Sequence, residues 1–426
     1  FFLYMKIAIE KYIGEKNIAS SQTKPFILII GLVLLLTSGF RYVNWNPTYG
    51  GWIEKIVFLF LAFYFFTNKT NSKQYNFHKE IILLAFIPFI SIFNSWSVYS
   101  QSIYDGLTAT LSSLVWIVYF LLPRYKLSET TILKIFLFVA IFIVAVQVLQ
   151  QFTYPNVLFG VSRAEDLDAT HTELAEQRNG LWRFRMHQNA YYTAPILFAA
   201  WTWLQKKANN KLLLLTVILL VSVYLTLTRQ VMVACIFAIF LSFFLGKKRI
   251  NKGAFFLGVA LIIGLYFAYD VLFSALAEQT KADSTEDNVR ILSAAYYWNE
   301  SIKNPFVFLF GHGEFSSDSY YGQMLTQLQT VFGFYIVDVG FIGQIYVNGI
   351  IYVLVCYALM YRVFFKLKNI VPTYIRMFVA FVSVMSPMIF PMTSASTYLV
   401  WVLLLYVCDL YINKSKNQII IKSINR

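Results

Sequence analysis

Three short patterns in the sequence bring arginines, carboxylic acids and glycines together in a way that suits chemistry at an anionic group. They are LTLTRQ at residues 225–230, the stretch from Arg290 through Trp298 to SIKNPFVFLFGHGEF at residues 301–315, and VDVGFIGQIYVNG at residues 337–349. The planar guanidinium of Arg229 or Arg290 stays charged at any working pH and can hold two phosphate oxygens at once. Asp338 offers a carboxylate that can take a proton from an attacking hydroxyl group. The patterns therefore predict a site where cations stabilise an anionic leaving group while a base activates a nucleophile.

Other polar side chains near these patterns are candidates for binding a substrate or moving a proton. His187 lies in RFRMHQNAYY and is a second candidate base, with Arg183 and Arg185 beside it as ligands for an anion. The further candidates for substrate binding are Trp298, His312 and Glu314.

Each candidate also has an ordinary structural explanation, which the sequence leaves open. An arginine near a membrane surface can extend toward water without binding anything. Asp338 can be a helix N-cap, His312 between two glycines can belong to a turn, and His187 can be a histidine at a loop end. The acidic run at residues 165–176 has no metal-loop spacing, so a solvated loop explains it.

Twelve apolar segments must carry these side chains, and they define the fold class. Of the 426 residues, 58% are hydrophobic and 13% are charged. Many apolar runs approach the ~20 residues that a helix needs to cross about 30 Å of bilayer. We therefore expect an all-α, polytopic integral membrane protein with one membrane domain over residues 1–426. The segments lie at residues 25–42, 52–67, 81–97, 107–123, 132–152, 190–205, 211–228, 230–246, 254–273, 337–362, 371–391 and 396–412.

The charges between these segments set their orientation. With a cytoplasmic N-terminus, the loops and ends on the cytoplasmic side hold 25 of the 35 Lys and Arg residues and 5 of the 21 Asp and Glu residues. The outer side holds 10 and 16, so the two faces carry net charges of +20 and −6. Since basic loops stay in the cytoplasm, we expect both termini there and the chemistry on the outer face.

Two long connections, at residues 153–189 and 274–336, both fall on the outer face. Long loops in compact proteins usually carry function. In the second loop, apolar residues at helical spacing predict a helix at about residues 285–303, ended by Asn304 and Pro305. We expect this helix to lie in the membrane interface, with its aromatic side chains at the depth of the lipid headgroups.

Several classes of function are excluded by the remaining features. The net charge of +14 arises in the cytoplasmic loops, which favours anionic lipids over nucleic acid as counterions. Cys235, Cys356 and Cys408 lie inside apolar segments without a CxxC pattern, so we expect neither a disulfide nor a metal centre. The opening residues show no cleavage site for a signal peptide, and because they begin at Phe1 we expect further residues before it.

Prolines interrupt two of the apolar segments. Pro88 lies in the third segment, and Pro387 and Pro391 lie in the eleventh, where we expect packed kinks. A transporter would carry ionisable residues in mid-span and broken helices in two related halves. Here the charges gather at the membrane surface, which favours an enzyme over a transporter or a scaffold.

Taken together, the three patterns resemble those of the O-antigen polymerase and ligase superfamily, integral membrane glycosyltransferases that use undecaprenyl-diphosphate-linked glycans. The family has a Ser-Arg or Thr-Arg turn, followed in a large outer loop by Arg, Trp, Asn-Pro and Gly-x-Gly. The matching residues are Thr228, Arg229, Arg290, Trp298, Asn304, Pro305, Gly311 and Gly313. The likeness covers the second half of the chain by motif and the whole chain by topology.

One position departs from the ligase pattern. At the head of the next span ligases typically carry His, with Gly ten residues later, whereas this chain has Asp338 followed by Gly340, Gly343 and Gly349. An Asp-x-Gly there is similar to the repeat-unit polymerases of the Wzy type. The resemblance therefore favours a polymerase over a ligase.

The resemblance implies a GT-C-like membrane glycosyltransferase in the bacterial inner membrane. Such an enzyme would join undecaprenyl-diphosphate-linked repeat units into O-antigen or capsular polysaccharide on the outer, periplasmic face, without a metal or other cofactor. Its catalytic residues would be Asp338, Arg290, Arg229 and His187, and its substrate-binding residues would be Arg183, Arg185, Trp298, His312 and Glu314. Its partners would be the lipid-linked oligosaccharides, membrane lipids, a flippase and a chain-length regulator, with no nucleic acid. The alternatives are a ligase that passes the glycan to an acceptor and a transporter of the polysaccharide or lipid-linked glycan.

The predicted orientation can be tested by labelling single cysteines in a variant that lacks the three native ones. Cysteines placed at residues 160–185 and 280–330 should react with an impermeant reagent added from outside, and a cysteine at residue 250 should react only after the membrane is opened. Labelling of residues 280–330 from the cytoplasm would remove the proposed site, because flipped lipid-linked units are present only on the outer face.

Overall fold

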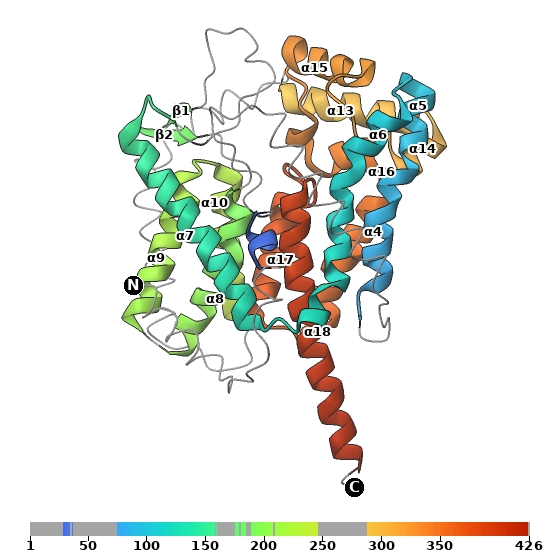
Figure 1. The fold of residues 1–426 in the computed structure, drawn as a ribbon. Helices are drawn as coiled ribbons and strands as arrows, with labels where there is room; N and C mark the ends of the chain where they lie inside the picture. Colours follow the sequence, from blue (N-terminus) through green and yellow to red (C-terminus); the bar gives the residue numbers. More distant parts are fainter. Residues whose placement is uncertain are drawn as a thin grey trace.

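A computed structural model of the chain describes residues 29–34, 36, 75–157, 159, 175–178, 180–184, 189–207, 209–245 and 288–424. Within these ranges the chain forms a helical bundle with one two-stranded antiparallel sheet (Figure 1). The sheet and helices α13 and α15 lie at one end of the bundle, and helix α18 extends from the opposite end (Figure 1). The predicted segments at 52–67 and 254–273 lie outside the described residues.

The helices follow the apolar segments, and the elements are as follows. In chain order they are α4 (His78–Ile90), α5 (Ile92–Tyr99), α6 (Ile103–Thr110), η2 (Leu111–Phe120), η3 (Leu122–Tyr125), α7 (Glu129–Thr153), β1 (Ala175–Arg178), β2 (Leu181–Phe184), α8 (Asn189–Lys206), α9 (Asn210–Leu225), α10 (Arg229–Leu245), α13 (Val289–Ile302), α14 (Pro305–Phe310), α15 (Tyr320–Phe332), η4 (Ile336–Val339), α16 (Gly340–Tyr361), η5 (Arg362–Lys366), α17 (Thr373–Met385) and α18 (Ala395–Ile424).

Among the described residues, five helical stretches are long and apolar enough to cross a membrane, and three apolar helices are shorter. The five stretches are His78–Tyr99, Ile103–Phe120, Glu129–Thr153, Ile336–Lys366 and Ala395–Lys416. These stretches agree with a polytopic membrane protein. The number of twelve spans stays a prediction.

Two predicted elements differ from the structure. The sequence predicts a helix with a packed kink over residues 371–391, but α17 ends at Met385. Pro387 has no N–H to continue the helix, and the carbonyl of Ser386 accepts a hydrogen bond from the backbone N–H of Phe341 instead (3.1 Å). Helix α13 begins at Val289 rather than at about residue 285, because the side chain of Asn288 caps it.

The aromatic residues of α13 also differ from expectation. Trp298 is exposed, as expected for an interfacial side chain, but Tyr297 is fully buried and its hydroxyl donates to the carbonyl of Phe334 (2.7 Å). Ser293, Tyr297 and Ser301 form the buried face of the helix. The small serines allow α13 to pack closely on the bundle, while its large apolar side chains point outward.

Two hydrophobic cores support the fold. The large core surrounds α18, in which every residue from Ala395 to Asp409 is buried. A small separate core joins α13, α15 and η4 to the first half of α16 through Tyr297, Tyr321 and Tyr346. We call α13, α14, α15 and η4 the helical cap. The three cysteines are buried and free, as expected for packing residues.

Buried polar contacts fasten the end of the bundle from which α18 extends. The carboxylate of Asp409 accepts hydrogen bonds from the hydroxyl of Tyr119 and from the backbone and side-chain nitrogens of Asn76. Arg362 forms an ion pair with Glu80. Each acid thus has a partner, as a charged group in an apolar environment requires.

Helix α16 is broken at Gly349, where φ is +81° and ψ is 166°. The break frees the carbonyls of Tyr346 and Val347 from the regular pattern of helical hydrogen bonds. The backbone N–H of His312 donates to Tyr346 (2.7 Å), and that of Gly313 donates to Val347 (2.8 Å). The Gly-His-Gly segment that follows α14 therefore provides the hydrogen bonds that the helix has lost.

Glycine is required on both sides of this contact. A Cβ on Gly349 would lie 2.2 Å from the carbonyl oxygen of Leu309, and a Cβ on Gly311 would lie 2.2 Å from that of Val347. Both glycines have positive φ, which disfavours other residues. The spacing of glycines in the sequence thus reflects close backbone packing between α14 and α16.

Substituting Gly349 by Ala should strongly reduce the yield and thermal stability of folded protein, because the new methyl group meets backbone that cannot move aside. Gly180→Ala is the matched control, since Gly180 has φ +73° but no atom within 4 Å of the position that a Cβ would take. The control should cost only roughly 1–2 kcal/mol of strain. Thermal unfolding of the detergent-purified variants measures both, and equal stability of the two would contradict the packing argument.

Candidate functional site

Glu314 follows the Gly-His-Gly segment and lies against the broken part of α16. One oxygen of its carboxylate accepts a hydrogen bond from the side-chain amide of Asn348 (3.5 Å), the residue next to the break. That amide also donates to Gln344 (3.0 Å). Burial raises the pKa of Glu314 to about 7, while the hydrogen bond from Asn348 lowers it in part. A carboxyl group with such a pKa can gain or lose a proton near neutral pH.

His312 is buried between the rings of Tyr99 and Tyr346. Neither ring nitrogen has a hydrogen-bond partner in the described part of the chain, although the backbone of Glu300 lies near enough to raise the pKa in part. Burial lowers the pKa of His312 to about 4, so the ring is neutral at physiological pH. The histidine occupies a packed core position at the tight turn that its neighbouring glycines allow.

Gln101, between α5 and α6, holds the chain on the other side of Glu314. Its amide nitrogen donates to the carbonyl of Glu314 (2.9 Å), and its amide oxygen accepts from the backbone N–H of Ser316 (3.0 Å) and the hydroxyl of Ser319 (2.8 Å). The buried amide of Asn94 donates to the carbonyl of Gly311 (2.6 Å). The main chain of residues 311–319 is therefore fixed by buried side chains of α5 and of the turn that follows it.

Asp338 lies in the η4 turn before α16 and is half-buried. The cap position of α16 is Val339, and no side chain caps that helix. The explanation of Asp338 as the N-cap of this span is therefore wrong. Gly340 packs so closely on Ser386 and Pro387 that a Cβ would clash with their backbone, which fixes the turn that carries the Asp338 carboxylate.

Arg290 and Arg229 both lie at the beginning of a helix. Arg290 is the second residue of α13, is exposed, and has no ion-pair partner among the described residues. Arg229 is the first residue of α10 and is half-buried. Cations usually avoid the positive end of a helix dipole. An arginine at the positive end of a helix instead suits an anionic ligand, although in α13 the side chain of Asn288 already accepts from the N–H of Arg290 (2.9 Å).

The turn before Arg229 is tightly constrained. Leu227 has φ +46°, an unfavourable conformation for leucine, and its N–H donates to Tyr224 (2.8 Å). The hydroxyl of Thr228 donates to the carbonyl of Thr226 (3.0 Å). The Thr-Arg turn thus presents Arg229 from a fixed backbone.

The β1–β2 hairpin carries Arg183, which lies opposite Glu176 in the sheet register. The hairpin is attached to α7 by Gln151, whose amide forms hydrogen bonds with both backbone groups of Trp182 (2.6 and 2.9 Å). Tyr154 stacks on the ring of Trp182 at 3.6 Å. Arg185 and His187 lie outside the described residues, so their roles stay predictions.

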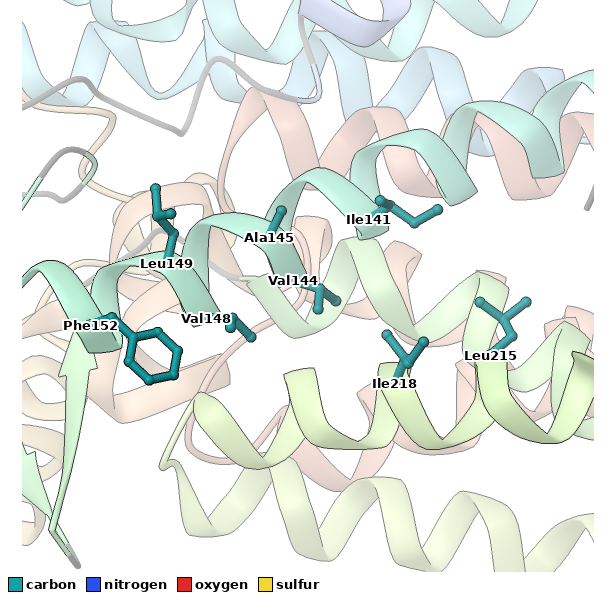
Figure 2. Close-up of a pocket in the computed structure, with 8 residues that line it drawn as sticks. All are labelled: Ile141, Val144, Ala145, Val148, Leu149, Phe152, Leu215 and Ile218. Atoms are coloured by element: carbon teal, nitrogen blue, oxygen red, sulfur yellow. The ribbon is translucent and has the colours of Figure 1, made fainter. Parts of the chain in front are cut away.

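An apolar groove of about 460 Å³ runs between α7 and α9 (Figure 2). Phe152 marks its end nearest the β1–β2 hairpin, since Gln151 holds that hairpin to the same turn of α7. The groove is lined by Ile141, Val144, Ala145, Val148, Leu149, Phe152, Leu215 and Ile218. Its lining suits a hydrocarbon chain and not a sugar.

The structure brings only some of the predicted site residues together. His312 and Glu314 meet at the break of α16, whereas Arg290 and Asp338 share no hydrogen bond with them in the described part of the chain. Trp298 packs edge-on against Phe308 at 5.9 Å. Sequence reasoning missed Gln101 and Asn348, although an asparagine inside an apolar segment is a signal that could have identified Asn348.

No group of three His, Cys, Asp or Glu side chains in the described ranges could hold a metal ion. The expectation that the protein uses no metal or cofactor stays a prediction.

Comparison with known families gives one match. Residues 214–336 match the family model described as O-antigen ligase. This match supports the O-antigen polymerase and ligase superfamily. The matched region contains Arg229, Arg290 and Glu314 and ends just before Asp338. Searches of curated proteins and of solved structures found no match.

Proposed function

We propose that this protein is a membrane glycosyltransferase that joins undecaprenyl-diphosphate-linked repeat units into O-antigen or capsular polysaccharide. The observation that carries the proposal is the position of Arg229 and Arg290, each at the start of a helix inside the region matched by the family model. In such an enzyme each arginine would bind the diphosphate and stabilise its charge as it leaves.

The remaining site residues take roles at the acceptor, the sugar or the diphosphate. Asp338 and Glu314 are alternative candidates for the one carboxylate that takes the proton of the acceptor hydroxyl, with His187 as a further candidate. Arg183 and Arg185 would assist at the diphosphate, and Trp298 would contact the sugar. His312, whose ring packs against Tyr99 and Tyr346, would support the turn that shapes the sugar site. No metal or cofactor is proposed.

The apolar groove between α7 and α9 supports a lipid-linked donor. A polyprenyl chain needs a hydrocarbon surface that continues to the place where its diphosphate is bound. The groove extends along α7 toward the turn that carries the hairpin with Arg183. We propose that it receives part of the undecaprenyl chain from the outer leaflet of the inner membrane, with both termini of the protein in the cytoplasm.

A ligase is the second candidate, because the matching family model is described as O-antigen ligase. The Asp at the head of α16, where ligases typically carry His, favours the polymerase. A glycan gel of a deletion strain separates the two. Loss of the ladder with one repeat unit retained supports a polymerase, whereas loss of the whole glycan from its acceptor supports a ligase. An unchanged glycan would contradict both.

Arg290→Lys should shorten the polymer almost as severely as Arg290→Ala. Lysine keeps the charge but loses the planar fork that binds two oxygens at once, so only a diphosphate ligand should be sensitive to the change. Lys303→Arg is the matched control, because Lys303 lies just beyond the other end of α13 and pairs with Glu300. Wild-type chain length in the Arg290→Lys strain, at equal expression, would remove Arg290 from the diphosphate site.

A further inference from the structure

We propose that Glu314 is the catalytic base that takes the proton from the acceptor hydroxyl, and that Asn348 positions its carboxylate. This inference rests on the glycosyl transfer proposed above. It assigns to Glu314 the role for which the sequence analysis favoured Asp338.

The geometry around Glu314 fixes its main chain and leaves part of its side chain accessible. The main chain is held through Gly313 by Val347 of α16 (2.8 Å) and through its own carbonyl by Gln101 (2.9 Å). One carboxylate oxygen accepts a hydrogen bond from the side-chain amide of Asn348, and the other has no hydrogen-bond donor in the described part of the chain. The residue is half-buried, and the proposal places the acceptor hydroxyl at this second oxygen.

Asn348 is suited to hold that carboxylate. The residue is fully buried, and its position is fixed because its amide also donates to Gln344. Its side-chain oxygen is buried without a hydrogen-bond partner among the described residues. A buried oxygen of this kind usually costs free energy. It is explained if it accepts a hydrogen bond from a bound hydroxyl group beside Glu314.

The electrostatic surroundings favour a base that works near neutral pH. The ionisable groups around Glu314 are Tyr321 from α15 and Tyr398 from α18, with His312 nearby in the same loop. No Lys or Arg within the described ranges forms an ion pair with it, so no cation holds it permanently ionised. Burial raises its pKa to about 7, and a base is most effective when its pKa lies near the working pH.

Asp338 cannot share this task with Glu314 at one hydroxyl. Asp338 precedes Gly340, and the helix from Gly340 to Asn348 rises by roughly 12 Å at 1.5 Å per residue. Asp338 is therefore separated along α16 by about two helical turns from Asn348, whose amide holds the Glu314 carboxylate. Asp338 also has no buried amide to orient it, since no side-chain hydrogen bond to it is found among the described residues.

The proposed step conserves atoms and charge. The acceptor oxygen forms a bond to the anomeric carbon of the donor sugar as the bond from that carbon to the diphosphate oxygen breaks. The hydroxyl proton moves to the carboxylate of Glu314, and the electron pair of the broken bond leaves with undecaprenyl diphosphate. Glu314 then loses its proton to water.

The test uses full-length protein in lipid nanodiscs, with the lipid-linked repeat unit purified from the deletion strain. Glu314→Gln should lower the release of undecaprenyl diphosphate by about 10²- to 10⁴-fold, the usual contribution of a general base. Asp318→Asn is the matched control, because it removes an exposed acid from the same loop. Binding of undecaprenyl diphosphate, measured by thermal shift, should be retained in both variants.

The dependence of the rate on pH distinguishes Glu314 from Asp338. The wild-type rate should fall as the pH drops below about 7, because protonated Glu314 cannot accept a proton. This fall of the rate at low pH is the acid limb of the pH profile. Asp338→Asn should keep the acid limb, and Glu314→Gln should lose it. Asn348→Ala should move the limb to higher pH, because the lost hydrogen bond favoured the charged carboxylate. A purely structural role of Asn348 would instead lower the rate equally at all pH values.

Three outcomes overturn the inference. They are a wild-type rate in folded Glu314→Gln, loss of the acid limb in Asp338→Asn, and an unchanged limb in Asn348→Ala. If Glu314→Gln does not fold, the pH profile of Asn348→Ala decides whether Glu314 is the base. If wild-type protein that binds undecaprenyl diphosphate neither releases it from the donor nor extends the glycan, the proposed function fails, and the base assignment fails with it.

Discussion

The helical cap of this protein depends on satisfying the backbone of one broken helix. Where α16 stops being helical at Gly349, two carbonyls lose their helical partners in apolar surroundings, where water cannot replace them. The backbone of His312 and Gly313 provides both hydrogen bonds. The helical cap is thus joined to the bundle by main-chain contacts, which tolerate little change in shape. This requirement explains why glycines occur on both segments.

The same contact places a carboxylic acid in an unusual environment. Glu314 comes directly after the segment that pairs with α16, so its position follows from that of the backbone. The acid is surrounded by tyrosines and amides rather than cations, which makes its charged form less stable than in water. The arginines proposed to bind the diphosphate lie at the starts of other helices. An arrangement of this kind separates the carboxylate that accepts a proton from the arginines that stabilise negative charge, so that neither neutralises the other.

Much of the fold could be predicted from hydrophobic periodicity, but contacts between elements could not. The patterns located α7, α9 and α10 well, because long apolar runs leave few alternatives to a helix. They misplaced the start of α13, because the residue that caps this helix is Asn288. They also misplaced the end of α17, because continuation of a helix past Pro387 depends on local hydrogen-bond partners. The Gly-x-Gly motif could be recognised in the sequence. Its role could not be predicted, because it depends on contact with the break of α16 at Gly349. The importance of Asn348 was hidden for the same reason.

The distances along the chain between bonded partners have a consequence for biogenesis. Glu314 and Asn348 are 34 positions apart, so the contact between the Gly-His-Gly segment and α16 closes a short loop at little entropic cost. Asn94 and Gly311 are 217 positions apart, and Asn94 enters the membrane first during synthesis. The side-chain amide of Asn94 therefore lacks this acceptor until residue 311 has been synthesised. The helix that carries it can reach its final packing only late, after more than two hundred further residues of the chain exist.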